Sequence, residues 1–354
     1  MVVETGFAAA GLASCRFVGG DVVEVTLSPE SAPPINCSPW YAFRARTLDE
    51  SERNLQIRFT YSECEHRYPP KASYDMIDWS GLGSVGSQSD AATFELTVTS
   101  RPVYVAAQEI LPVATYSSWI DQLSDSGKAR TEVIGQSVEG RPIEALTIGN
   151  PQARDVVLVL GRQHPPEISG ARGLFAYVDT LVSDDAVMQA YREDVLTIVV
   201  PVLNPDGVEN GHWRHNAGGV DLNRDWAAYT QPETRAVRDK LQSLLDEDYR
   251  LVLVLDFHST RRDVLYTLAE DIETDPPGLV EDWIVALNRR TPAFSFDLAP
   301  GYSAGSGVAK NFFYERFGVP AVTIEFGDET DREAIAREGQ AIAYAWAEVF
   351  AERR

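Results

Sequence analysis

The hydrophobic and polar positions of the chain follow one rhythm in its first third. Across residues 17–105 apolar and polar side chains alternate, as they do within 23–27 and again within 55–61. Strict alternation is typical of β-strands that bury one face and expose the other. Turn-forming clusters such as 81–84 separate these segments, which favours antiparallel pairing. The pattern predicts an N-terminal antiparallel β-sandwich domain over residues 1–111.

Beyond residue 112 continuous apolar runs replace the alternation. They lie at residues 156–160, 196–200 and 251–255, and runs of this kind are typical of strands that are covered on both faces. Segments of helical length lie between and after the runs, at residues 170–193, 232–246, 277–290 and 331–352. This alternation predicts an α/β domain over residues 112–354, with a mixed, mostly parallel sheet flanked by helices.

The charge of the chain narrows the possible partners. It has 31 basic and 53 acidic side chains, a formal net charge of −22. A field of this sign repels phosphate backbones and anionic lipids, so we expect neither nucleic acid nor a membrane as a partner. No apolar run approaches the roughly 18 residues that a membrane-spanning helix needs. The sequence leaves the oligomeric state open.

The three cysteines suggest a reducing environment. Cys15, Cys37 and Cys64 form no C-x-x-C pair, so we expect reduced thiols rather than a disulfide framework or a cysteine zinc site. An apolar stretch before Cys15 superficially resembles a lipoprotein cleavage site, but no Lys or Arg precedes it. The sequence predicts a cytoplasmic protein, with a lipoprotein or an exported form as the less favoured alternative.

Polar side chains follow two of the apolar runs. His164 and Glu167 come after the first run, and His258 comes after the third. Open α/β sheets bind ligands at the carboxyl ends of their strands, and two imidazoles with one carboxylate are a known ligand set for a catalytic zinc. Because a His-x-x-Glu spacing also occurs by chance, the alternative of simple hydrogen-bonded histidines stays open.

A longer motif between residues 204 and 226 favours the zinc interpretation. It contains Asn-Pro-Asp-Gly at 204–207, His-Trp-Arg at 212–214 and Gly-Val-Asp-Leu-Asn-Arg-Asp-Trp at 219–226. Together with the residues above, it resembles the zinc metallocarboxypeptidases of the carboxypeptidase A type. The β-domain makes the chain most similar to their cytosolic carboxypeptidase branch. The strong resemblance covers about 131–328, and that of the β-domain, around 40–44, is looser.

The resemblance implies a site with one zinc ion per chain. By position, His164, Glu167 and His258 would be its ligands, and the remaining roles fall on residues in the family's order. Arg214 would polarise the scissile carbonyl, Asn223 and Arg224 would bind the terminal carboxylate of the substrate, Glu325 would be the catalytic base, Tyr302 the mobile tyrosine, and Asp221 the carboxylate that orients the first zinc histidine.

Physical chemistry agrees with these roles. A zinc-bound water has a pKa near 7, and a carboxylate at the end of a buried strand, as Glu325 is, can accept its proton. The guanidinium of Arg224 and the amide of Asn223 match the hydrogen-bonding groups of a terminal carboxylate. Because only a chain end carries such a carboxylate, this pair favours exopeptidase action. Each residue has an alternative: Asp221 as a helix cap, Arg214 in a surface ion pair, Glu325 as a strand-end charge, and Tyr302 as loop packing. His212 and His215 match no ligand position and are interpreted as rim residues.

Lys310 is the candidate for substrate preference. An ungapped alignment back from Glu325 through Tyr314 places it at the floor position of the family's side-chain pocket. A buried ammonium there would favour C-terminal Glu or Asp, as in the deglutamylating activity of the cytosolic branch. The alternative is a solvated lysine on a helix over about 308–317, and the acidic net charge weighs against an acidic substrate.

We therefore predict a metallocarboxypeptidase that acts on the C-termini of peptides or proteins. Two alternatives remain: a zinc amidase or carboxypeptidase that acts on cell-wall (murein) peptides, and a catalytically silent binding protein. The presence of Glu325 argues against the silent protein. The role of the β-domain and the binding of a second metal stay open.

Overall fold

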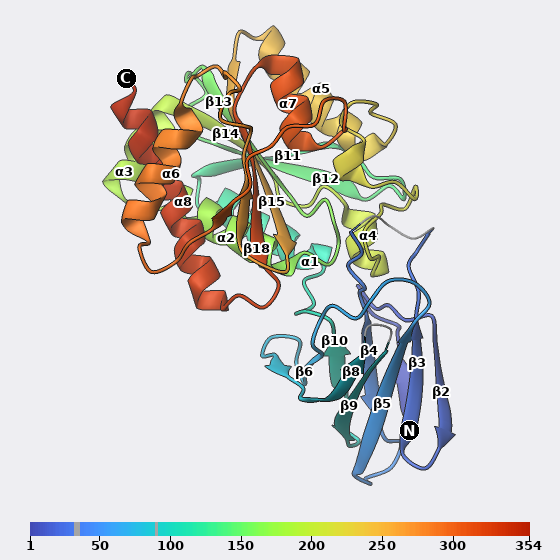
Figure 1. Cartoon of the computed structure of the whole chain (residues 1–354). Helices are drawn as coiled ribbons and strands as arrows, with labels where there is room; N and C mark the ends of the chain where they lie inside the picture. Colours follow the sequence, from blue (N-terminus) through green and yellow to red (C-terminus); the bar gives the residue numbers. More distant parts are fainter. Residues whose placement is uncertain (32–35, 89–90) are drawn as a thin grey trace. The chain divides into compact units, whose positions relative to one another are not determined.

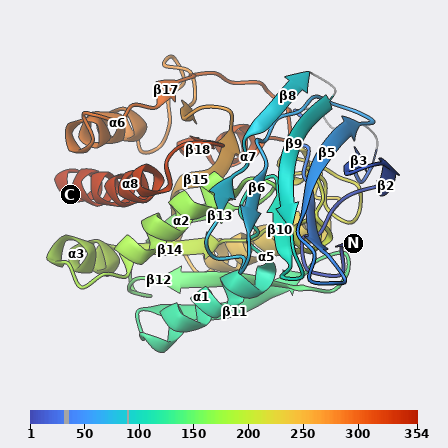
Figure 2. The same ribbon diagram turned by 90° about the horizontal axis from the view of Figure 1, so that it is seen from below.

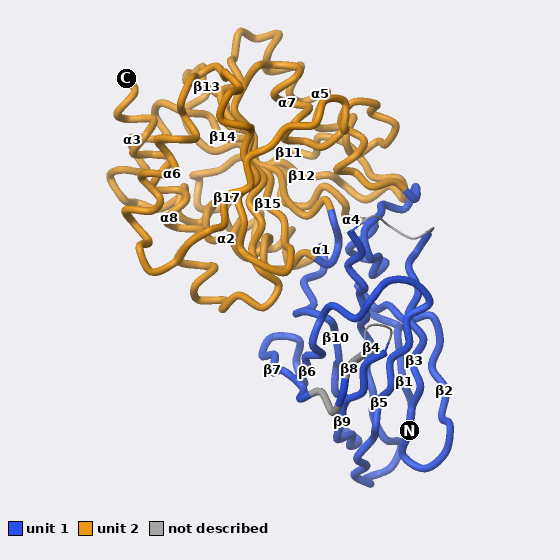
Figure 3. The backbone as a smooth tube through the Cα atoms, viewed as in Figure 1, with its two compact units in different colours: residues 1–113, 164–166, 206–219 blue, residues 114–163, 167–205, 220–354 orange. Residues whose placement is uncertain are grey.

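A computed structural model describes residues 1–31, 36–88 and 91–354 of the chain (Figure 1). The chain forms two units, which Figure 3 distinguishes by colour. Unit 1 comprises residues 1–113, 164–166 and 206–219, and unit 2 comprises 114–163, 167–205 and 220–354. The separation of residues 1–111 and 112–354 into two domains stays a prediction.

Unit 1 contains two five-stranded sheets in its described residues. The first has the order β1 (Val2–Glu4), β4 (Ala42–Arg46), β10 (Val103–Ala106), β6 (Lys71–Ser73), β7 (Ser80–Gly81). The second has the order β2 (Ser14–Gly19), β3 (Val22–Leu27), β5 (Arg53–Tyr61), β9 (Ala91–Val98), β8 (Ser84–Gln88). The predicted β-architecture is confirmed, with one departure: β3 and β5 pair in parallel, because no hairpin joins them.

The core of unit 1 follows from the alternation in the sequence. In β3 the side chains of Val23, Val25 and Leu27 are buried while their neighbours are partly exposed. Phe59 of β5 packs against Tyr41, with ring centroids 4.4 Å apart, and against Phe94 at 5.0 Å. Period-two strands thus place one apolar face of each sheet in a shared interior.

The prediction of reduced cysteines was wrong for one pair. Cys37 and Cys64 form a disulfide, with Cα atoms 6.1 Å apart, and Cys15 is a free thiol. The two bonded residues are separated by 27 positions. A disulfide depends on the spatial approach of the two Cβ atoms, which the spacing of cysteines along a chain does not reveal.

Unit 2 is built on an eight-stranded mixed sheet. Its order is β11 (Ala129–Gln136), β12 (Pro142–Ile148), β14 (Val195–Val200), β13 (Asp155–Gly161), β15 (Arg250–Thr260), β18 (Ala321–Gly327), β16 (Val264–Tyr266), β17 (Asp297–Leu298). The central pairs β14–β13, β13–β15 and β15–β18 are parallel. The predicted mixed, mostly parallel sheet is therefore confirmed, and its three apolar runs are the buried strands β13, β14 and β15.

Helices cover both faces of this sheet. On one face lie α1 (Val113–Asp125), α2 (Ile168–Leu181), α3 (Ala186–Asp194), α6 (Leu279–Arg290) and α8 (Arg332–Glu352). Figure 2 shows α8 between α6 and α3. On the other face α5 (Pro232–Asp246) and α7 (Ala309–Phe317) pack on the strands. Two short helices, α4 (Pro205–Asn210) and the 3-10 helix η1 (Leu222–Arg224), lie in the segment of the longer motif.

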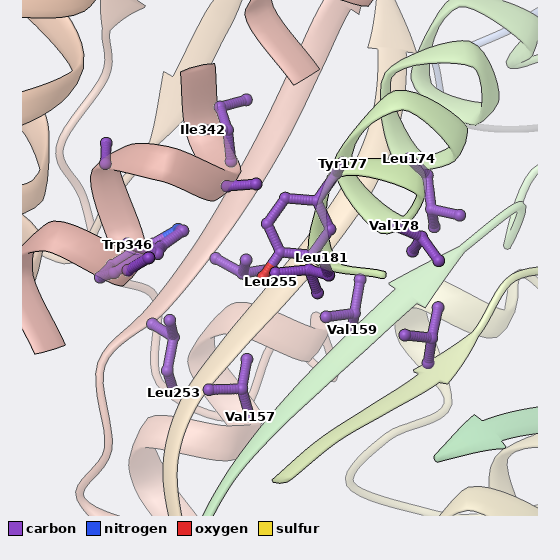
Figure 4. Close-up of a cluster of buried hydrophobic side chains, with 14 of the residues drawn as sticks. Val157, Val159, Leu174, Tyr177, Val178, Leu181, Leu253, Leu255, Ile342 and Trp346 are labelled. Atoms are coloured by element: carbon purple, nitrogen blue, oxygen red, sulfur yellow. The ribbon is translucent and has the colours of Figure 1, made fainter. Parts of the chain in front are cut away.

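The larger core lies between α2, α8 and the central strands (Figure 4). Tyr177 of α2 and Trp346 of α8 point toward the strand residues Val159 and Leu255, and all four are buried. Trp346 also stacks on Trp283 of α6, with ring centroids 4.6 Å apart. Burial of large apolar side chains on both faces makes the sheet a stable base for the polar groups at its strand ends.

The predicted helix over 170–193 is in fact two helices. α2 ends at Leu181, and Asp185 caps α3 by accepting a hydrogen bond from the backbone N–H of Val187. The break falls at the polar run Ser183, Asp184 and Asp185, and because Ser and Asp are preferred N-cap residues, this run was a usable signal that the prediction overlooked. The helix at 232–246 has the predicted bounds. Among the described residues, no helix combines the length and the apolar character needed to cross a membrane.

Gly170 near the start of α2 supplies a prediction about stability. A Cβ atom at this position would lie 2.6 Å from the carbonyl carbon of His258, so α2 and β15 approach too closely for a larger residue. We expect Gly170→Ala to lower the free energy of unfolding by about 1–3 kcal/mol, measured by urea denaturation. Gly6→Ala is the control, because nothing lies within 4 Å of a Cβ there. Equal stability of both variants would contradict this packing argument.

Candidate active site

The site residues lie where the central parallel strands end. β13 ends at Gly161, and the chain passes through His164 to Glu167, which directly precedes α2. His258 lies near the end of β15, and the register of the parallel pair places it beside Glu325 of β18. The apolar runs thus fix the strands, and the strand register fixes which polar residues become neighbours.

The three predicted zinc ligands come together. His164, Glu167 and His258 are buried, and one potential ligand atom from each lies within 4.8 Å of the others. Ligand atoms that bind one zinc at about 2.0–2.2 Å must lie within a similarly small sphere. The donor set and its burial therefore fit a zinc ion.

Two carboxylates surround the imidazole of His258. Its Nδ1 lies 2.7 Å from Glu167 Oε2, and its Nε2 lies 2.8 Å from Asp256 Oδ2. Burial alone would lower the pKa of His258, but the charges of Asp256 and Glu167 outweigh it and raise the pKa well above its usual value. The pocket therefore favours positive charge at this point, which a divalent metal also supplies.

Sequence reasoning missed Asp256 and the group that holds it. Gln163 Nε2 lies 2.8 Å from each oxygen of Asp256, and Gln163 Oε1 accepts a hydrogen bond of 3.0 Å from Trp226 Nε1. Residues two apart on a strand point to the same face, so an acidic residue two positions before His258 was a usable signal. Asp256 has the geometry of a carboxylate that orients a ligand imidazole.

The Asp-x-Asn-Arg segment forms η1 next to His258. Asp221 accepts a hydrogen bond of 2.9 Å from the backbone N–H of Asn223, and so caps this helix. Asn223 Nδ2 lies 3.3 Å from His258 Nε2, and Asn223 Oδ1 accepts a hydrogen bond from Ala309 N at 2.8 Å. Arg224 is exposed. Asp221 therefore caps the helix, as the alternative for this residue predicted. The other role, in which Asp221 orients the imidazole of His164, stays a prediction.

Tyr302 lies in the loop between β17 and α7. Its side chain is exposed, and its hydroxyl donates a hydrogen bond of 3.1 Å to Glu315 Oε1. The ring meets Tyr314 edge-on, with centroids 5.5 Å apart. An exposed tyrosine that one hydrogen bond holds can change its rotamer at small cost, which is compatible with the predicted mobile role.

Lys310 is buried near the start of α7. The alternative of a solvated lysine was wrong, because only 6% of the residue is exposed. Its Nζ donates to the backbone oxygen of Thr267 at 2.8 Å and to that of Gly301. Burial lowers the pKa of Lys310 to about 8. Neutral pH therefore leaves a mostly charged ammonium inside the protein.

Arg214 lies in unit 1, where residues 206–219 belong to the same unit as the β-sheets. It is 5% exposed, and its Nη1 donates to the backbone oxygen of Asn36 at 3.3 Å. The surface position that one alternative assumed for Arg214 is therefore wrong. His212 and His215 are both partly buried, and His212 Nδ1 lies 3.0 Å from the backbone oxygen of His215.

Comparison with known proteins identifies the family. The model of the zinc carboxypeptidase family matches residues 116–352. Mouse and human cytosolic carboxypeptidase 6 are 31% and 33% identical over 138 residues, which is 36% of this chain and 26% and 27% of theirs. An uncharacterised protein of Zymomonas mobilis is 28% identical over 49% of this chain and 46% of its own length. The matched region thus spans less than half the length of these relatives.

Solved structures support the same fold over the whole chain. The metallo-carboxypeptidase of Burkholderia cenocepacia has a TM-score of 0.86 at 21% identity, and that of Pseudomonas aeruginosa a TM-score of 0.78 at 23% identity. Both comparisons cover 100% of each chain. The family match covers most of the sequence, and the resemblance found in the motifs is confirmed: the chain belongs to the zinc carboxypeptidase family.

The contacts of Asp256 generate a prediction about metal affinity. Asp256→Asn removes the charge that faces His258 Nε2, and loss of such an outer carboxylate typically weakens metal binding 10–100-fold. We expect a zinc dissociation constant raised by about that factor, measured by competition with a chromogenic chelator. Asp246→Asn, at an exposed end of α5, is the control. Unchanged affinity in the Asp256 variant would show that this carboxylate does not tune the metal.

Proposed function

We propose that this protein is a zinc-dependent metallocarboxypeptidase that hydrolyses the C-terminal peptide bond of peptides or proteins. The main support is the buried cluster of His164, Glu167 and His258 in a chain of the zinc carboxypeptidase family. The register that makes Glu325 a neighbour of His258 supports the proposal that Glu325 is the base. Peptide or protein C-termini are the proposed substrates.

The proposed mechanism assigns one task to each residue. A zinc ion at the cluster would supply a bound water whose pKa is near 7. Glu325 would serve as the general base that takes up a proton and later returns it to the leaving amine. Arg214 donates N–H groups to the carbonyl oxygen as negative charge develops there.

Residues of η1 bind the C-terminal end of the substrate in this mechanism. Asn223 and Arg224 hold the terminal carboxylate by charge-assisted hydrogen bonds, and Tyr302 covers the bound end. This contact requires a free C-terminus, which explains the removal of terminal residues rather than internal cleavage. The alternatives, a zinc amidase or carboxypeptidase for murein peptides and a silent binding protein, have no comparable support from the family match.

We further propose a preference for C-terminal Glu or Asp that depends on Lys310. Its buried ammonium is bound to two backbone oxygens, and these neutral acceptors leave its charge uncompensated. A substrate carboxylate would balance that charge, whereas a basic side chain would add to it. The acidic net charge of the chain opposes such a substrate, so local cations must dominate at the site.

Glu325→Gln tests the mechanism. The substitution keeps the shape of the side chain but removes its ability to accept a proton, so we expect kcat to fall by about 10²–10⁴-fold while zinc content is unchanged. The measurement is release of single C-terminal residues from a peptide library, read by mass spectrometry, with metal content determined in parallel. Glu333→Gln on the exposed side of α8 is the control. Full activity of the Glu325 variant would refute the assignment.

The pKa of Lys310, lowered to about 8 by burial, makes the proposed preference depend on pH. As pH rises through 8 the ammonium loses its proton, so the ratio of kcat/KM for Glu-terminated over Leu-terminated peptides should fall by roughly 10-fold or more. Taking a ratio cancels the titration of the zinc site, which both peptides share. Lys310→Met should give a low ratio at every pH, and Lys240→Met on α5 should behave as the unmodified protein. A ratio independent of pH would remove Lys310 from specificity.

A further inference from the structure

Glu30 makes an unusual set of contacts with the segment that contains Arg214. Its carboxylate accepts hydrogen bonds from three consecutive backbone N–H groups, those of Trp213 at 2.7 Å, Arg214 at 3.0 Å and His215 at 2.6 Å. All four residues belong to unit 1. The Glu30 side chain is only 8% exposed. Three amide donors that converge on one buried carboxylate fix the backbone of a short segment strongly.

Side-chain contacts strengthen this attachment. His215 Nδ1 lies 3.3 Å from Glu30 Oε1 and 2.7 Å from Ser31 Oγ. Burial alone would raise the pKa of Glu30, but the hydrogen bonds from His215 and Trp213 lower it to about 2. Glu30 is thus an anion at neutral pH. Arg214 is held at both ends, since its backbone binds Glu30 and its guanidinium binds the backbone oxygen of Asn36.

A second attachment lies a few residues earlier in the same segment. Glu209 accepts a hydrogen bond from Ala9 N on its backbone oxygen and one from Val113 N on Oε1, each at 2.8 Å. Gly211 has a φ of 65°, and a Cβ there would lie 2.6 Å from the backbone oxygen of Ala10. Residues 206–219 therefore lie closely against the N-terminal part of the chain in unit 1.

We propose that Glu30 is a positioning residue for Arg214. The proposal rests on the role given to Arg214 above. A donor that stabilises developing charge works only if it is held in place before the reaction, and a displacement of about 1 Å can cost 10²-fold in rate. Glu30 fixes the main chain at Arg214 itself, where such a displacement would arise.

The variant Glu30→Gln tests the proposal. It preserves the length of the side chain but replaces one acceptor oxygen with an N–H₂ group that faces backbone donors. We expect kcat for peptide hydrolysis to fall 10–100-fold, with KM changed less than 3-fold and zinc content unchanged. Glu4→Gln is the matched control, a carboxylate of β1 that pairs with Arg44 and Arg46. A kcat within 2-fold of the unmodified protein would overturn the proposal.

A double-mutant cycle separates positioning from a general structural effect. If Glu30 acts through Arg214, Glu30→Gln should lower kcat no further in an Arg214→Ala background. A merely structural role would lower kcat by the same factor in both backgrounds, and that outcome would overturn the proposal. Glu30→Asp keeps the anionic acceptor. A kcat for this variant close to that of the unmodified protein would support the proposal.

Hydrogen exchange distinguishes this proposal from the proposed function. In Glu30→Gln, amides of residues 213–215 should exchange at least 10-fold faster than in the unmodified protein, whereas strands β13 and β15 should be unchanged. Unchanged exchange at 213–215 would show that Glu30 does not hold the segment. If the unmodified, zinc-loaded protein released no residue from any peptide, the proposed function would be wrong. Hydrogen exchange at residues 213–215 would then still show whether Glu30 holds this segment.

Discussion

The buried charge around His258 is the constraint on which the site depends. Glu167 and Asp256 both face one imidazole, and all three residues are buried. Burying charge costs several kcal/mol per ion unless the charge is balanced. An imidazole supplies at most one positive charge against these two carboxylates, so a divalent cation is the natural way to balance the cluster. The composition of the cluster therefore fits a divalent metal on physical grounds, beside the evidence from the family.

The rest of unit 2 makes this arrangement possible. Burial of apolar side chains on both faces fixes the register of β13, β15 and β18, and that register makes His258 and Glu325 neighbours. Gly170 allows α2 to approach the backbone of β15, and Glu167 directly precedes this helix. Gln163 then holds Asp256 through two hydrogen bonds. Side chains supported by strands and packed helices are held more closely than those on free loops.

The sequence predicted the features that depend on local pattern. The apolar runs became β13, β14 and β15 because strands covered on both faces need apolar residues at every position. The helix at 232–246 was found with its bounds because Pro232 marks its first turn. The cluster of His164, Glu167 and His258 was predicted because these residues come after the apolar runs, in an order that resembles a known family.

What the sequence could not predict depends on contacts between distant residues. The parallel pairing of β3 with β5 and the bond between Cys37 and Cys64 leave no mark in local composition. Glu30 is more than 180 positions from the N–H groups that it binds, and a single glutamate near a proline carries no signal of that role. Asp256 differs, because its place two residues before His258 on one strand was visible but was not used.

The contacts of Glu30 connect the N-terminal part of unit 1 to the segment that contains Arg214. Burial of a carboxylate is unfavourable in itself, and the amides of Trp213, Arg214 and His215 together with the imidazole of His215 offset that cost for Glu30. The dependence is mutual, since those amides would otherwise lose their partner. The sheet region and residues 213–215 therefore stabilise each other's conformation, which links folding of the N-terminal region to the placement of Arg214.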